Sequence, residues 1–167
     1  MPNNFARAKG LGKWGEKQVI NHLMSKPGTI MVNDVAEDKE WQNKGIDIVV
    51  TDKTGEWTAD VKLDRMIART GNLFIEIMSS DKTMGNMVTS SADYFLYLDP
   101  FNCKLFTINR QKLFDFWHDN QKDIVTKEVG KSERKTKGFL ITVELIQEIG
   151  LAIVEDIYVD GARKNKI

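Results

Sequence analysis

Apolar and polar positions follow two periods along this chain, one typical of helices and one typical of strands. Residues 12–25 carry apolar side chains at three- and four-residue spacing, as one face of a helix requires, and Pro27-Gly28 ends that pattern. Short β-branched or apolar runs predict strands at residues 29–33, 46–51, 57–63, 73–78, 94–98, 104–108 and 139–143. Because the two patterns are interspersed, we expect an α/β fold with a central mixed β-sheet flanked by helices.

The polar segments between these strands are expected to form loops and short helices. Residues 34–44 are highly charged and are expected to form a loop, and the basic stretch 131–137 is expected to be an exposed, mobile loop. Further helices are predicted at residues 88–92, 109–118 and 144–150. The sequence contains no obvious linker or repeat, so we expect one domain over residues 1–167, with its core at about 12–158 and a polar tail at 160–167.

Three of the predicted strands each hold one acidic residue among apolar neighbours. These residues are Asp47, Asp60 and Glu76. A buried carboxylate without a partner costs several kcal/mol, roughly, so each one needs a compensating group. Side chains alternate between the two faces of a strand, so Lys62 shares a face with Asp60. If the strands that hold the three acids form an antiparallel meander, their carboxylates approach one another on one face, which suggests ligands of a divalent cation.

Two carboxylates are enough for a magnesium site. Mg²⁺ takes oxygen ligands at about 2.0–2.1 Å and usually keeps several waters. The carbonyl oxygen of Val61 would add a further ligand to Asp47 and Asp60. Lys62 would orient or deprotonate a metal-bound water and stabilise the charge that builds on a phosphate. The residues therefore predict metal-dependent chemistry.

The order of these residues resembles the PD-(D/E)XK nuclease superfamily. The resemblance covers roughly residues 12–98 and is carried by Glu16 in the first helix, Gly45-Ile46-Asp47, and Asp60-Val61-Lys62. Ile46 stands where the motif has its nominal proline, and Asp60 stands where glutamate is more frequent. The similarity to small phage- and plasmid-type members lies in Val61-Lys62-Leu63-Asp64, Thr70-Gly71-Asn72 and Phe74-Ile75-Glu76.

The resemblance implies a restriction-endonuclease-like core of helix, antiparallel strands, helix and strand. It implies a DNA nuclease, an endonuclease more than an exonuclease, that uses Mg²⁺ or, as a substitute, Mn²⁺. Asp47 and Asp60 would bind the metal, Lys62 would be the catalytic lysine, and Glu16 would complete the site directly or through water. Glu76 is a further candidate for the metal site. By analogy with paired members of the superfamily, a homodimer is plausible.

Each assignment has a structural alternative. Asp60 and Lys62 are also what an edge strand with two exposed charges would show, and Glu16 could lie on a solvated helix face. Glu76 could instead pair with Lys62 or Arg65. The alternative function is that of a catalytically silent DNA-binding protein of the same fold, for example a phage counter-defence or recombination accessory protein. A purely structural interaction domain would leave the buried charges unexplained.

The balance of charge argues against a uniformly basic nucleic-acid binder, because the chain holds 24 basic and 24 acidic side chains. Basic residues nevertheless gather near the N-terminus and around residues 131–137. They predict contacts to a DNA backbone from Arg7, Lys9, Lys13, Arg134, Lys135 and Lys137. Ordinary solvated surface is the alternative for each patch.

Other residue types narrow the range of functions and compartments. Cys103 is the only cysteine and cannot form an internal disulfide, which favours the cytoplasm of a bacterium or a phage-infected host. No apolar run approaches the roughly 18 residues of a membrane span, so we expect no membrane partner. His22 and His118 are too few for a histidine-based metal site. The sequence lacks the Gly-x-x-x-x-Gly-Lys pattern, which argues against ATP use.

Overall fold

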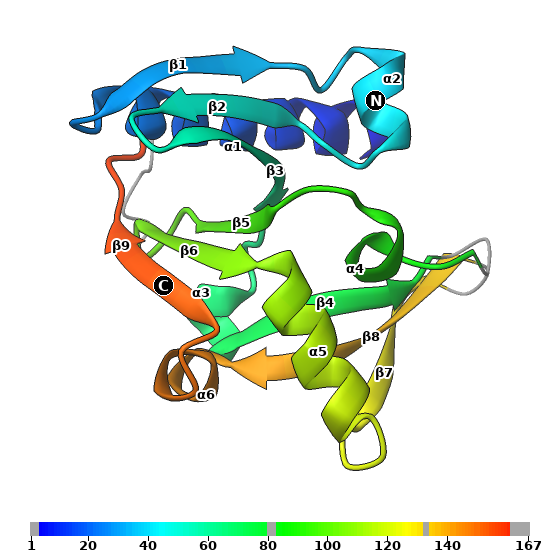
Figure 1. Cartoon of the computed structure of the whole chain (residues 1–167). Helices are drawn as coiled ribbons and strands as arrows, with labels where there is room; N and C mark the ends of the chain where they lie inside the picture. Colours follow the sequence, from blue (N-terminus) through cyan, green and yellow to red (C-terminus); the bar gives the residue numbers. More distant parts are fainter. Residues whose placement is uncertain (1–3, 80–82, 132–133, 161–167) are drawn as a thin grey trace.

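A six-stranded mixed sheet forms the centre of the fold (Figure 1). The computed structural model describes residues 4–79, 83–131 and 134–160. The strand order is β1-β2-β3-β5-β6-β9, and β3 and β5 run parallel while every other neighbouring pair is antiparallel. The strands are β1 (Thr29–Asp34), β2 (Ile48–Asp52), β3 (Gly55–Leu63), β5 (Tyr94–Asp99), β6 (Lys104–Asn109) and β9 (Ala152–Asp156).

The long helix α1 (Asn4–Ser25) covers one face of this sheet. Its apolar stripe places Val19 and Leu23, one turn apart, against apolar side chains of β2, β3, β5 and β6. Gly15 lies where the helix comes closest to β3, because a Cβ added there would lie 3.2 Å from the Cβ of Leu63. This close approach places Gly15, and with it the neighbouring Glu16, beside the end of β3.

A second, three-stranded antiparallel sheet lies on the other face (Figure 1). Its order is β4-β8-β7, formed by β4 (Asn72–Met78), β8 (Arg134–Thr142) and β7 (Thr126–Lys131). Apolar side chains from both sheets and from short helices fill the space between them. These helices are α3 (Ile67–Thr70), α4 (Asn86–Thr89), α5 (Arg110–Asn120) and α6 (Val143–Glu148).

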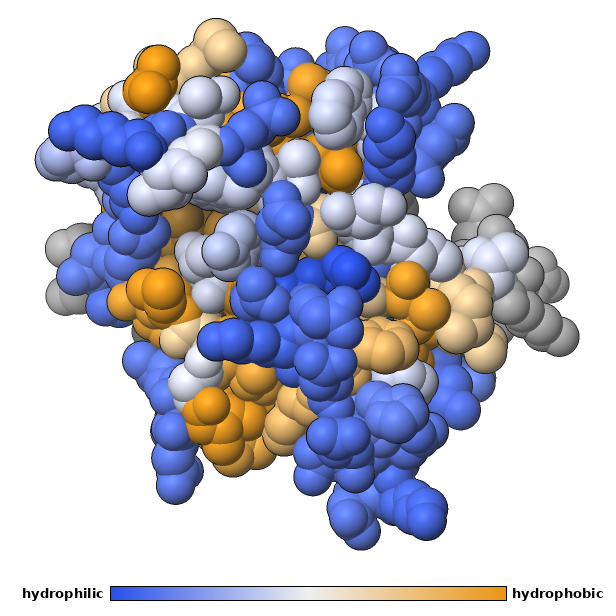
Figure 2. Space-filling view, viewed as in Figure 1, coloured by the Kyte–Doolittle hydropathy of each residue, from blue (hydrophilic) through white to orange (hydrophobic). Residues whose placement is uncertain are grey.

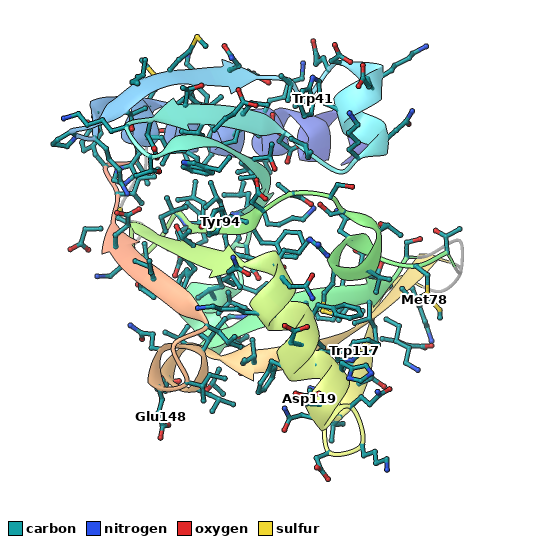
Figure 3. The ribbon with its side chains drawn as sticks, viewed as in Figure 1. Trp41, Met78, Tyr94, Trp117, Asp119 and Glu148 are labelled. Carbon is teal, nitrogen blue, oxygen red and sulfur yellow. The ribbon has the colours of Figure 1, made fainter. Side chains whose placement is uncertain are left out.

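Tryptophan side chains pack against two of the hydrophobic clusters. Figure 3 shows Trp117 on α5, where it packs against the core between the two sheets. It also shows Trp41 on α2 (Lys39–Asn43), which packs against a small cluster of Ile46, Val49 and Ala92 at the start of β2. On the face in Figure 2, hydrophobic side chains reach the surface in separate patches among hydrophilic ones.

The α/β class and the mixed, helix-flanked sheet are confirmed. In that sheet β5 pairs antiparallel with β6. Asn109 caps the start of α5, since its Oδ1 accepts the N–H of Lys112 at 3.0 Å. None of the helices in the described part of the chain is long and apolar enough to span a membrane.

Two sequence predictions about strands are wrong. Residues 73–78 do not extend a meander with the two preceding strands, because β4 pairs with β8 in the second sheet. The basic stretch 131–137 is not a free loop, because its residues, apart from the undescribed 132–133, belong to the paired strands β7 and β8.

Smaller differences concern short elements and bounds. The expected loop 34–44 contains α2, the helix expected at 88–92 lies at Asn86–Thr89, and β9 was not predicted. The predicted tail falls almost wholly outside the described residues.

Candidate metal and catalytic site

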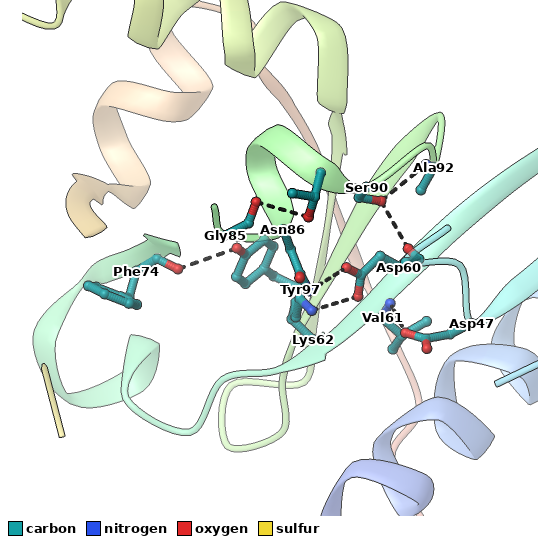
Figure 4. A network of polar contacts seen from close by, with 12 residues as sticks. Asp47, Asp60, Val61, Lys62, Phe74, Gly85, Asn86, Ser90, Ala92 and Tyr97 are labelled. Carbon is teal, nitrogen blue, oxygen red and sulfur yellow. Dashed lines mark hydrogen bonds and ion pairs between the residues drawn. The ribbon is translucent and has the colours of Figure 1, made fainter. Parts of the chain in front are cut away.

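Asp60 is a buried carboxylate with both oxygens in contact with polar groups (Figure 4). The residue is 2% exposed. Its Oδ1 lies 2.7 Å from Nζ of Lys62, and its Oδ2 accepts a hydrogen bond from Nδ2 of Asn86 at 3.0 Å. Ala59 and Val61 point to the α1 side of the sheet, so Asp60 and Lys62 both face the second sheet, as the strand alternation predicts.

Asp47 lies beside Asp60 where β2 and β3 separate. The last pairing contact between the two strands there is the hydrogen bond from the Asp47 N–H to the Ala59 carbonyl, at 2.9 Å. Two residues further along β3, the Val61 N–H donates to Oδ2 of Asp47 at 2.8 Å. In an extended strand the N–H and C=O of one residue point to the same edge, so the Val61 carbonyl lies on the edge that Asp47 occupies.

The pKa of Asp60 is raised from 3.8 to about 6. Burial is the largest cause, and the negative charge of Asp47 adds to it, while Lys62 works in the opposite direction. The two aspartates are therefore close enough to repel each other. This arrangement favours a bound cation or a proton at the pair.

Glu16 comes from α1 and lies on the other side of Asp47. Its pKa is raised, first by burial and then by the charge of Asp47. Glu16 and Asp47 also line one hollow of about 470 Å³, together with Lys13 of α1, Glu37 from the loop before α2, and Gln42 of α2. The structure thus brings Glu16 to the aspartate pair from a separate element.

Glu76 does not reach the site by the route that the sequence suggested. It lies on β4 in the second sheet and is not on a strand adjacent to β3. Its charge raises the pKa of Tyr97, as do burial, which is the largest cause, and the charges of Asp60 and Asp64. Tyr97 stands next to Lys62 in the parallel pairing of β3 and β5, so Glu76 belongs to the outer surroundings of the site.

Asn86 and the segment that follows it were missed at the sequence level. Asn86 is the first residue of α4 and binds Asp60 directly. Ser90 Oγ donates to the Gly45 carbonyl at 2.9 Å, two residues before Asp47. Spacing alone could not have identified these contacts, because the pattern of residues 84–92 indicates a short helix but not the residues on other elements that it contacts.

The predicted DNA-binding residues lie on two separate elements. Lys13 is exposed and forms an ion pair with Glu37. Lys135 lies 3.5 Å from Glu128, and Lys137 on β8 is half-buried. Of the other three candidates, Arg7 and Lys9 belong to α1 and Arg134 to β8, and their side chains lie outside the described part of the structure.

The start of α1, α2, α4 and the β7–β8 hairpin all lie toward the same side of the molecule (Figure 1). The aspartate pair is placed between these elements by its contacts to α4 and by the hollow that Asp47 shares with α1 and α2. No three His, Cys, Asp or Glu side chains within residues 4–79, 83–131 and 134–160 form a group that could hold a metal by themselves.

Comparison of the chain with protein-family models finds no match, and neither curated proteins nor solved structures give a significant match.

Proposed function

We propose that this protein is a Mg²⁺-dependent nuclease that hydrolyses DNA phosphodiester bonds, with Mn²⁺ able to replace Mg²⁺. The observation that carries the proposal is the buried Asp60 carboxylate, which lies beside Asp47 and is held by Lys62 at 2.7 Å. A like-charge pair of this kind is costly unless a cation or a proton accompanies it.

The donor atoms fit a magnesium ion better than a softer metal. Asp47, Asp60 and the Val61 carbonyl would hold it, and all three offer oxygen. Mg²⁺ is usually bound through one or two carboxylates and keeps several waters. A pair of aspartates without a third acidic, histidine or cysteine ligand is therefore compatible with this ion.

When bound, the ion would polarise a phosphate oxygen and favour ionisation of a bound water. Lys62 is 34% exposed, so its ammonium is accessible to a phosphate while it contacts Asp60. It would stabilise the negative charge that develops on the phosphate. Glu16, with its raised pKa, would accept a proton from water at the same site.

The order of elements supports the proposal. Helix α1, the antiparallel strands β1-β2-β3, helix α4, and β5 parallel to β3 follow the order that the PD-(D/E)XK resemblance implies. Asp47 precedes β2, and Asp60 and Lys62 lie on β3. The restriction-endonuclease-like core is part of the proposal, as is DNA as the partner.

A cleavage assay tests this function. Purified protein is incubated with plasmid, linear and branched DNA, with Mg²⁺, with Mn²⁺ or with a chelator. We expect cleavage only with a divalent cation, and we expect Asp60→Asn to abolish it.

Asp156→Asn is the matched control, because Asp156 also binds a lysine, Lys104, at 2.7 Å, but its side chain is 87% exposed on β9. Its cleavage rate should equal that of the wild type. If the protein binds DNA but cleaves it with neither Mg²⁺ nor Mn²⁺, the alternative of a catalytically silent DNA-binding protein is favoured. If the protein neither binds nor cleaves DNA, both proposed functions are contradicted.

A further inference from the structure

The two oxygens of Asp60 are fixed from different parts of the fold. Lys62, which contacts Oδ1, belongs to the same strand as Asp60. Asn86, which donates to Oδ2, is 26 residues away on α4. A carboxylate with one donor on each oxygen has a fixed rotation as well as a fixed position. The direction of its remaining lone pairs is then set by the residue outside the strand.

Asn86 is held in place by contacts of α4 with the second sheet. The N–H of Gly85 donates to the carbonyl of Ile77 at 2.9 Å, which fastens the start of α4 to β4. A Cβ on Gly85 would lie 2.8 Å from Cγ of Glu76 and 2.9 Å from its carbonyl oxygen. Only glycine allows this approach without a shift of the backbone. Met87, the residue after Asn86, is 1% exposed in the core between the sheets.

The same segment also holds the turn before Asp47. Ser90 Oγ donates to the Gly45 carbonyl at 2.9 Å, and the N–H of Ser91 donates to the Lys44 carbonyl at 2.7 Å. A Cβ on Gly45 would lie 3.1 Å from the side chain of Ser90. One short segment therefore contacts Asp60 directly and holds the turn that precedes Asp47, as Figure 4 shows from close by.

We infer that Asn86 is a positioning residue for the metal site, and that it sets the affinity of the site for a divalent cation by fixing the orientation of Asp60. This inference rests on the proposed function for its catalytic consequence, but its effect on cation binding is independent of the substrate. Groups that hydrogen-bond to a metal ligand typically change metal affinity or activity by about tenfold to a hundredfold when removed.

Titration of the protein with Mn²⁺ alone, without DNA, tests the inference. Asn86→Ala should weaken Mn²⁺ binding by about tenfold or more. Asn86→Gln keeps an amide donor and should recover part of that loss. In the cleavage assay, Asn86→Ala should lower kcat at subsaturating Mn²⁺ and leave the KM for DNA near the wild-type value.

The β5–β6 turn offers a matched control. Asn102 donates to Oδ2 of Asp99 at 2.8 Å, and Asp99 is fully buried, so the pair repeats the chemistry of Asn86 and Asp60 away from the site. Asn102→Ala should reduce thermal stability and leave Mn²⁺ affinity unchanged.

Asp60→Asn, measured in the same titration, separates the two claims. If Mn²⁺ binds Asp60→Asn as tightly as it binds the wild type, the metal site of the proposed function is wrong. If Asp60→Asn loses the ion while Asn86→Ala binds it normally, the positioning role of Asn86 is overturned and the proposed function stands. An equal loss in Asn86→Ala and Asn86→Gln would overturn the role of the amide donor.

Discussion

At the scale of single residues, Asp60 is a carboxylate that burial and a neighbouring like charge make costly to ionise. Its pKa is about 6 in the folded chain and 3.8 ordinarily. Because the folded state disfavours the ionised form, this residue supports stability fully at low pH, and the support is lost as the pH rises through about 6. The two values differ by about two pKa units, which corresponds to roughly 3 kcal/mol.

We therefore expect Asp60→Asn to be as stable as the wild type near pH 4 and more stable near pH 7, in chelator. The loss of the partner of Lys62 will reduce the gain below the roughly 3 kcal/mol that the pKa difference allows. Urea unfolding of both proteins from pH 4 to pH 7 measures this difference. If the free energies of unfolding of the two proteins change with pH in parallel, the pKa of Asp60 is not raised in the folded state.

A substitution of Lys62 distinguishes a catalytic role from a structural role more easily than a substitution at any other site residue. We expect Lys62→Ala to reduce the turnover number about 10²- to 10³-fold, because the variant has no positive charge to face the developing phosphate charge. The affinity for DNA should change by a small factor only. The affinity for Mg²⁺ should also change little, because the lost contact to Asp60 is offset by the removal of a positive charge beside the cation. Lys104→Ala removes a strand lysine from an exposed ion pair with Asp156 and serves as the control. Turnover of Lys62→Ala equal to that of Lys104→Ala would exclude a catalytic role.

At the scale of elements, α4 connects the second sheet to the aspartate pair. Gly85→Ala should destabilise the protein by about 1–3 kcal/mol, because the added methyl overlaps with β4 and the backbone must shift. It should also weaken Mn²⁺ binding, because Asn86 moves with the helix. In Gly10→Ala, on α1, the added Cβ has no neighbouring atom within 4 Å. This variant should instead stabilise the protein by about 0.5–1 kcal/mol, because alanine favours the helix more than glycine does. Urea unfolding and Mn²⁺ titration check both variants. If Gly85→Ala stabilises the protein as Gly10→Ala does, the role of Gly85 in packing is contradicted.

The β7–β8 hairpin carries the basic residues that we expect at a DNA backbone. The double variant Lys135→Gln/Lys137→Gln should bind DNA more weakly and flatten the slope of log affinity against log salt by about one for each phosphate that is no longer neutralised. Cleavage at saturating DNA should stay near normal. A double variant at Lys104 and Lys112, on β6 and α5, removes the same charge away from the hairpin. Equal salt slopes in the two double variants would show that the hairpin is ordinary solvated surface.

Local patterns predicted most elements, whereas pairing between distant strands was not predictable. The helix before Pro27 and the strands of the central sheet other than β9 follow from periodicity and turn residues. The pairing of Phe74 with Leu140 spans 66 residues, and a strand pattern contains no information about so distant a partner. The same limit explains Asn86, since only the position of α4 on β4 brings it to Asp60. The many charges along β7 and the start of β8 favour a loop at the sequence level, because neither segment has a long apolar run.

At the scale of the whole molecule, two sheets face each other and the candidate site lies at one side of their junction. Asp60 comes from the central sheet and Asp47 from the residue before its strand β2. Glu16 comes from the helix behind the sheet, and Asn86 from the segment that the second sheet holds. The basic hairpin and the start of α1 lie toward the same side (Figure 1). DNA bound there would contact both sheets. A homodimer with two such sites stays a prediction.

The central claim is that Asp47 and Asp60 hold one divalent cation. The most direct test is crystallographic, with Mn²⁺ located by its anomalous scattering in the wild-type protein. We predict a peak between the two carboxylates and near the Val61 carbonyl, with oxygen contacts slightly longer than the about 2.0–2.1 Å typical of Mg²⁺, and no peak there in Asp60→Asn. Absence of a peak at this pair in the wild-type protein, at a Mn²⁺ concentration that supports cleavage, would contradict the claim. A peak that contacts Glu16 and Glu37 but neither aspartate would contradict it as well.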